Sequence, residues 1–241
     1  MNLLGTLLTD ALWNRSLPTD TVKWACTPGD APPPMLDARQ ITQLHDQATL
    51  RWHQDATRPD PLPFAQPEDP DSLIQMALAQ HRANFDLWHE EDKAREPDVS
   101  DAHITEVKHA IDAFNQRRND LVEEMDRTLL AAAGTQNPDA PLQSESPGLI
   151  VDRLSILALK IYHTAEEVRR PSASETHHQK NLNRLALLEE QRNDLATCLD
   201  QLWSEVLKGK RRFKLYRQMK MYNDPELNPM VYAHKAAARS S

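Results

Sequence analysis

Apolar side chains recur every three or four positions through most of this chain, which is the period of an amphipathic α-helix. No stretch shows the sustained alternation of Val, Ile and Thr between turn residues that is typical of strands. The pattern therefore predicts an all-α protein. The expected helices lie at about 37–55, 71–95, 101–131, 149–169 and 174–208, with a further, basic helix at about 210–222.

Stretches rich in Pro, Asp and Gly separate the predicted helices, as expected of loops. Several of the helices begin beside a residue that favours the N-cap position: Asp71, Ser72, Ser100, Asp101, Ser172 and Ser174. We divide the chain into an N-terminal extension at 1–36, one helical domain at 37–232 and a tail at 233–241. The apolar start of the extension, MNLLGTLLTDALW, is too short for a membrane span and lacks the basic residues of a signal peptide, so we expect a docking helix.

An internal repeat relates two helical hairpins, at about 71–131 and 149–208. A shift of 74 positions places LWHEEDKAR on IYHTAEEVR and RNDLVEEMD on RNDLATCLD. Two copies of a hairpin bury their apolar stripes most simply in an antiparallel four-helix bundle. We therefore expect such a bundle, built by duplication, with extra N-terminal helices and the basic C-terminal helix beside it.

The run GLIVDRLSILALKIYH, residues 148–163, carries charged side chains within an apolar segment. Spacing also places Arg118 and Arg192 on the apolar stripes of two other predicted helices. Pairing the second hairpin about a turn near residue 172 puts Asp152 between these two arginines, which would keep the carboxylate ionised and lower its pKa. The cluster is either a structural ion network or a fork for an anionic ligand, and both interpretations stay open.

Histidines suggest a second kind of chemistry. His89 and His163, with Asp112 nearby, have the functional groups needed for acid and base catalysis, although each imidazole is equally explained by ordinary hydrogen bonding on a helix. His53, like the other two, follows an aromatic residue. We do not predict a metal site, because neither His89 nor His163 has the Glu three residues earlier that is typical of helical bundles, and Lys160 would repel a cation.

Composition narrows the range of functions. The net charge is −8, and residues 208–220 hold seven of the 28 basic residues and no acidic one. This balance excludes a general nucleic-acid binder, while one basic patch suits a phosphate group or an acidic partner. Cys26 and Cys198 lack the spacing of a disulfide framework or a zinc site, so we expect a reducing cytoplasm.

Four motifs resemble those of the bacterial family called domain of unknown function 4254: NFDLWHEEDKAR, IDAFNQRRNDLVEEMD, ESPGLIVDRLSILALKIYH and KMYNDPELNP. The resemblance extends from about residue 40 to about 232. It implies a helical protein with no established reaction, encoded near glycosyltransferases and other genes of surface polysaccharide or lipopolysaccharide assembly. The motif residues that it carries over are Asn84, Trp88, His89, Glu91, Asp92, Arg95, Asp112, Asn115, Arg118, Asn119, Asp120, Asp152, Arg153, Lys160 and His163.

Three functions follow as hypotheses. The leading one is a cytoplasmic protein of surface glycan assembly that binds an anionic sugar metabolite, or a glycosyltransferase, through the polar bundle interior. The second is a hydrolase or transferase of a phosphorylated sugar or nucleotide that uses His89, His163 and Asp112, and the third is a structural homodimer with a buried ion network. The sequence identifies no cofactor. The expected ligand-binding residues are Asn84, Asp92, Arg95, Asn115, Arg118, Asn119, Asp152, Lys160 and Arg192.

Overall fold

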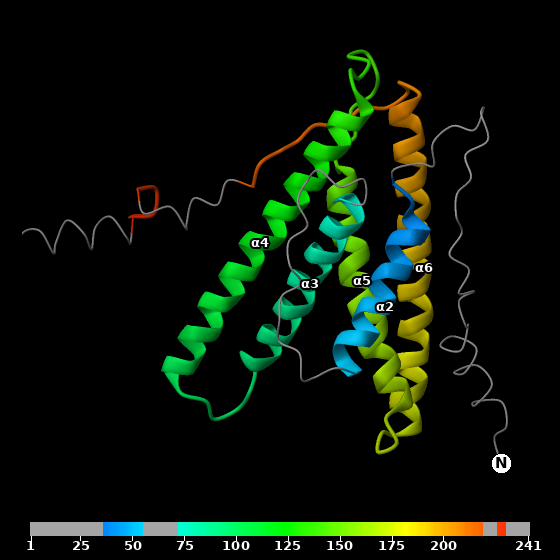
Figure 1. Cartoon of the computed structure of the whole chain (residues 1–241). Coiled ribbons are helices and arrows are strands. Elements are labelled where there is room, and N and C mark those ends of the chain that lie inside the picture. The colour runs from blue at the N-terminus through cyan, green and yellow to red at the C-terminus, as the bar shows by residue number, and fades with distance from the viewer. Residues whose placement is uncertain (1–35, 55–71, 219–225, 230–241) are drawn as a thin grey trace, which may run out of the picture. The chain divides into compact units, whose positions relative to one another are not determined.

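The computed structural model describes residues 36–54, 72–218 and 226–229. These residues contain five helices and no strand, apart from one isolated bridge between Leu142 and Arg212 (Figure 1). The all-α prediction is confirmed, and each of the five helices begins and ends within two residues of its predicted bounds. The helices are α2 (Ala38–Gln54), α3 (Ser72–Lys93), α4 (Asp101–Ala133), α5 (Pro147–Arg169) and α6 (Glu175–Leu207).

Local sequence explains where three of these helices start. The hydroxyls of Ser100 and Ser174 accept hydrogen bonds from backbone N–H groups three residues on, so both predicted N-caps are confirmed. Ser146 caps α5 in the same way, and Pro147 follows in the first turn, where its missing N–H costs nothing. At the other end of α4, Gly134 has a φ of +66°, a conformation that glycine adopts without strain.

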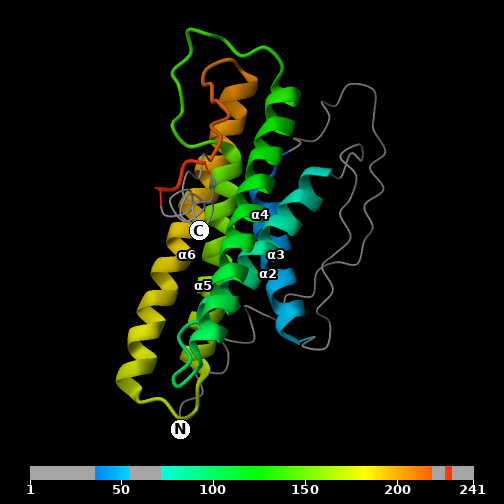
Figure 2. The same cartoon turned by 90° about the vertical axis from the view of Figure 1, so that its left-hand side faces the viewer.

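The helices pack as two antiparallel hairpins joined through α5 and α2. Both views show α3 alongside α4 and α5 alongside α6 (Figure 1, Figure 2). Helix α5 also packs on α2, α3 and α4, while α2 packs on α3, α5 and α6. The predicted four-helix arrangement is thus incomplete, because α2 is a full member of the bundle. The duplication of the hairpin stays a prediction.

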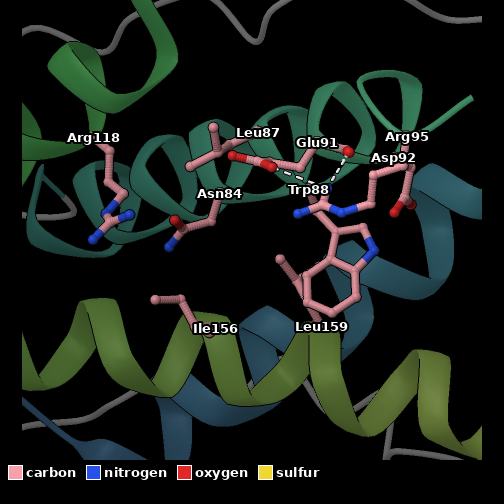
Figure 3. Close-up of a pocket in the computed structure, with 9 residues that line it drawn as sticks. All are labelled: Asn84, Leu87, Trp88, Glu91, Asp92, Arg95, Arg118, Ile156 and Leu159. Atoms are coloured by element: carbon pink, nitrogen blue, oxygen red, sulfur yellow. Dashed lines mark hydrogen bonds and ion pairs between the residues drawn. The ribbon is translucent and has the colours of Figure 1, made fainter. Parts of the chain in front are cut away.

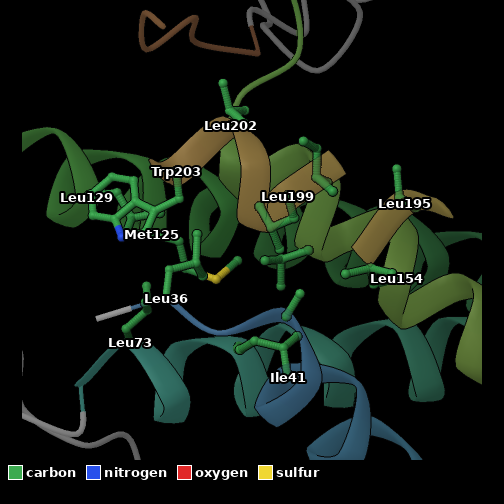
Figure 4. Packing of buried hydrophobic residues seen from close by; sticks show 14 of the residues in the cluster. Leu36, Ile41, Leu73, Met125, Leu129, Leu154, Leu195, Leu199, Leu202 and Trp203 are labelled. Carbon is green, nitrogen blue, oxygen red and sulfur yellow. The ribbon is translucent and has the colours of Figure 1, made fainter. Parts of the chain in front are cut away.

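A continuous apolar core links all five helices (Figure 4). Its side chains with no measurable exposure include Ile41 of α2, Ala77 of α3, Met125 of α4, Leu154 of α5 and Leu199 of α6. Full burial of one large aliphatic side chain contributes about 1.5–3 kcal/mol. The core therefore fixes the relative positions of the helices that carry the polar residues described below.

The predicted basic helix at about 210–222 is wrong over residues 211–218, which form no helix. Long-range backbone pairing replaces helical hydrogen bonds here, since the N–H of Gln143 donates to the carbonyl of Arg212 at 2.7 Å. Phe213 is buried in the core with 1% exposure, so this segment is anchored by one aromatic side chain. The rest of the predicted helix lies outside the described residues, except residue 210, which belongs to the turn after α6.

None of the five described helices combines the length and the apolar content needed to cross a bilayer. The predicted N-terminal docking helix lies in residues 1–35, outside the part of the chain that the structure describes.

Candidate functional site

Asp152 of α5 is held by side chains from two other helices. It is 5% exposed, and its Oδ1 lies 3.0 Å from the Nε of Arg118 on α4. Two amides of α3 donate to the same oxygen, Asn84 at 3.0 Å and Gln80 at a shorter distance. The buried charge is therefore both paired and hydrogen-bonded, as a carboxylate in a core requires.

Arg192 does not share this carboxylate, so the predicted pair of arginines around Asp152 is wrong. Its Nη1 donates to both carboxylate oxygens of Asp46, at 3.0 and 2.9 Å. Asp46 comes from α2, which packs against α6. The presence of α2 in the bundle thus supplies a nearer partner for Arg192, and the two arginines belong to separate ion pairs.

The predicted direction of the Asp152 pKa is also wrong. Burial raises the pKa of Asp152 above its usual value, and the charge of Arg118, together with the hydrogen bonds from Asn84, Arg118 and Gln80, only partly offsets this effect. The physical reason is that a single arginine, itself 25% exposed at the side chain, compensates the desolvation less than two enclosed arginines would.

A second set of hydrogen bonds continues from Asp152 to α2. Asn84 also donates to the hydroxyl of Ser155 at 2.9 Å, and that hydroxyl lies 2.7 Å from the Nδ1 of His81. The Nε2 of His81 is 2.8 Å from the hydroxyl of Thr49. Ser155 and His81 have no exposed surface, so a ligand in a surface cavity does not reach them. This chain therefore ties α2, α3 and α5 together in one register.

A cavity of about 380 Å³ opens where α3, α4 and α5 meet (Figure 3). Trp88 forms an aromatic wall over Leu159 of α5. Arg95, in the turn after α3, is paired with Glu91 at 2.9 Å. The lining residues are Asn84, Leu87, Trp88, Glu91, Asp92, Arg95, Arg118, Ile156 and Leu159. Apolar and hydrogen-bonding groups thus face one space.

A second cavity, of about 360 Å³, also has Arg118 in its lining. The non-helical segment after α6 contributes Lys214 and Tyr216 to it. Its remaining lining residues come from α4, from the loop before α5 and from α5 itself: Asn115, Arg118, Asn119, Val122, Glu123, Asp126, Ser144, Ser146, Leu149 and Asp152, with Gln218 after Tyr216. Arg118 is therefore a wall of both cavities.

Most of the predicted ligand-binding residues line one of these two cavities. Asn84, Asp92, Arg95 and Arg118 line the first, and Asn115, Arg118, Asn119 and Asp152 line the second.

Three predicted residues lie elsewhere. Lys160 lines a cavity of about 530 Å³ between α5 and α6, and Arg192 faces α2. Asp112 lies on the exposed side of α4, 2.5 Å from the Nζ of Lys108, so it forms its ion pair there rather than with a histidine. The prediction groups all three residues at one site, but sequence spacing does not say which neighbouring helix a helix face meets.

The structure brings His89 and His163 together and adds His53 of α2. One nitrogen from each ring lies within 4.8 Å of the others. His53 packs closely, since its ring centroid is 5.2 Å from that of His89 and 5.0 Å from that of His163. The sequence had singled out His53 only by its aromatic predecessor, because α2 was not assigned to the bundle.

Aromatic rings frame this cluster of three histidines. Tyr162 stacks on His53 at 4.1 Å with an interplanar angle of 19°, and Trp88 stacks on His163 at 4.9 Å and 9°. Trp88 is also a wall of the first cavity. The histidine cluster and the cavity are therefore joined through one indole.

The fold and the site together define an all-α protein with a cavity whose lining combines apolar side chains with a few hydrogen-bonding groups. The family described as Protein of unknown function (DUF4254) matches residues 74–215, more than half of the chain, and the protein belongs to this family. No curated protein and no solved structure matches the chain. The matched region contains all the residues that line the first cavity, whereas His53 and Asp46 of α2 precede it.

Proposed function

We propose that the protein binds a sugar metabolite with an anionic group in the first cavity, and that it serves surface glycan assembly in the cytoplasm. The observation that carries this proposal is the combination of one indole face with planar hydrogen-bonding side chains around a cavity of about 380 Å³. Ligand pockets typically measure about 300–1,000 Å³ and combine apolar walls with a few directed polar groups.

The chemistry of the lining residues suits a sugar. The C–H face of a pyranose packs on an aromatic ring, which Trp88 supplies. Carboxylates such as Asp92 accept hydrogen bonds from sugar hydroxyls, while guanidinium groups such as Arg118 and Arg95 match phosphate or carboxylate oxygens. Arg118 directs Nε to Asp152 and makes only a 3.4 Å bond from Nη1 to Asn115, so it keeps donor capacity for a ligand.

The cellular setting of the proposal rests on the family resemblance. That resemblance implies a place beside glycosyltransferases of polysaccharide or lipopolysaccharide assembly, so a nucleotide sugar or a sugar phosphate is the ligand class we favour. A glycosyltransferase partner belongs to the same proposal.

The proposal is tested by a thermal-shift and calorimetric screen of the full chain against nucleotide sugars, sugar phosphates, neutral sugars and inorganic phosphate. A ligand present at 100 times its dissociation constant adds about 2.7 kcal/mol of stability. We expect a sugar phosphate or nucleotide sugar to bind, with Asp92→Asn and Arg95→Gln each weakening it about tenfold or more. Lys93→Gln is the matched control, since Lys93 is exposed on the same helix and does not line the cavity.

Two results would defeat this proposal: no response to any compound in the screen, or unchanged affinity in both cavity variants. If inorganic phosphate bound as tightly as the sugar phosphates, the sugar would contribute nothing to binding, and the proposed sugar specificity would be wrong.

The alternative functions are catalysis by His89, His163 and Asp112, and a structural homodimer. The Nε2 of His163 is buried without a hydrogen-bond partner, which is unfavourable for direct proton exchange with a ligand in the cavity. Asp112 is paired with Lys108 on the exposed side of α4 and thus does not orient either imidazole.

A further inference from the structure

We propose that His53, His89 and His163 bind a divalent transition-metal ion through their Nε2 atoms. The site is formed by α2, α3 and α5, and the proposal does not depend on the ligand suggested for the cavity.

Each of the three rings has its Nδ1 atom already engaged. The Nδ1–H groups of His53 and His89 donate to backbone carbonyls one helical turn earlier, at 2.7 and 2.8 Å. The Nδ1–H of His163 donates to the carboxylate of Glu166 at 2.9 Å. Bonds from the second ring nitrogen to a carbonyl or carboxylate are the usual support of metal-binding histidines, because they fix the tautomer that leaves Nε2 free to ligate.

Two of the three Nε2 atoms lack a hydrogen-bond partner. The Nε2 atoms of His53 and His163 are buried and make no hydrogen bond. Leaving such an atom buried and unpaired is unfavourable.

The spacing of the rings is close to that of a metal site. Tetrahedral coordination with bonds of about 2.0–2.1 Å requires nitrogen atoms about 3.4 Å apart. One nitrogen of each ring already lies within 4.8 Å of one nitrogen of each of the other two, so a bound metal would draw the three rings closer together. Tyr162 and Trp88 stack on two of the rings and limit the orientations that they adopt.

The ligand set selects the kind of metal. Three neutral imidazoles suit zinc, iron, cobalt, nickel or copper, whereas magnesium and calcium prefer oxygen ligands. Three protein ligands leave at least one position for water or a small ligand. Lys160 does not oppose this site, because it lines the cavity between α5 and α6 together with Arg153 and Asp194.

The test uses the untagged full chain, stripped with a chelator and then titrated with Zn²⁺ and with Co²⁺. We expect one equivalent of metal per chain by elemental analysis, visible absorption bands for bound Co²⁺, and a rise in thermal stability with Zn²⁺. His53→Gln, His89→Gln and His163→Gln each remove one ligand and are expected to weaken binding about a hundredfold. His109→Gln is the matched control, since His109 is exposed on α4.

Circular dichroism of the metal-free variants shows whether each one is folded. If a variant is unfolded, imidazole ¹⁵N spectra of the wild-type chain test the site instead. Binding of Zn²⁺ by the three histidines should shift their three Nε2 signals together. Absence of stoichiometric binding, or equal binding by the three variants and the His109 control, would overturn the proposal. No sugar is present in these measurements, so their outcome is separate from that of the cavity screen.

Discussion

Acid should destabilise the protein through His45, and His45→Leu should remove that effect. His45 lies in α2 with no exposed surface, stacked on His81 at a ring-centroid distance of 4.4 Å. Burial lowers the pKa of His45 to about 3, against a smaller opposing effect of the backbone at Ala77, and the charge of Arg192 adds to the lowering. Neither ring nitrogen makes a well-directed hydrogen bond.

The sign and size follow from proton linkage. The unfolded chain binds a proton at His45 near pH 6.5, whereas the folded chain does so only near pH 3. The neutral His45 ring makes its full contribution to the free energy of unfolding above pH 6.5. As the pH falls toward 3 this contribution is lost, by about 1.4 kcal/mol per pH unit once the ring is charged in the unfolded chain. Between pH 7.5 and 5.5 the loss is about 1–1.5 kcal/mol.

Other groups titrate in this window, so the comparison with a variant is essential. Burial raises the pKa of Asp126 to about 6, and protonation of this carboxyl favours the folded state as the pH falls, which opposes the histidine effect. Asp126 is present in both proteins, and its effect cancels in the difference. Leucine replaces an imidazole without leaving a hydrogen-bond partner behind, so the variant should fold.

The assay is urea unfolding of the wild type and His45→Leu at pH 7.5, 6.5 and 5.5, followed by circular dichroism. The free-energy difference between the two proteins should move in favour of the variant by about 1–1.5 kcal/mol from pH 7.5 to 5.5. His109→Gln, an exposed histidine change, provides the control. A difference that stays constant over this range would refute the reasoning, because it would mean that His45 takes up its proton as readily in the folded chain.

Three further predictions concern packing and the ion pair, each measured by urea unfolding. Gly148→Ala should lower the free energy of unfolding by about 1–3 kcal/mol, because its methyl group would lie 2.8 Å from a carboxylate oxygen of Asp126 and from a backbone carbonyl. An unchanged free energy of unfolding would contradict this close approach. Arg118→Met should lower the free energy of unfolding by about 2–4 kcal/mol, since Asp152 would stay buried without a counter-ion. Adding Asp152→Asn should restore part of this loss. If it restores none, the unpaired charge is not the cause. Phe213→Ala should cost about 3–5 kcal/mol, and a loss below about 1 kcal/mol would indicate that the segment after α6 is not anchored.

Helices were predictable from the sequence because their signals are local. The period of the apolar residues and the serine caps at Ser100 and Ser174 lie within a few residues of the boundaries that they define. The segment containing Phe213 was not predictable in this way, since a loop more than sixty residues earlier supplies its hydrogen bonds. A basic, helix-favouring composition was overridden by tertiary contacts.

The candidate site was predicted only in part, because local spacing does not encode the long-range contacts that complete it. Spacing correctly showed that Arg118 and Asp152 face inward, and their ion pair follows from the hairpin geometry. The same reasoning assigned Arg192 to the wrong partner and left His53 outside the cluster. Both errors come from α2, whose position between α3 and α6 depends on packing that no short sequence pattern encodes.

Arg118 lines both cavities, so anions bound in the two would compete for one guanidinium. A molecule that draws the cation toward one side weakens the electrostatic attraction available on the other. By reciprocity, the second molecule would lower the affinity for the first by the same factor. Such competition for a single side chain would couple binding in the two cavities without any helix having to move.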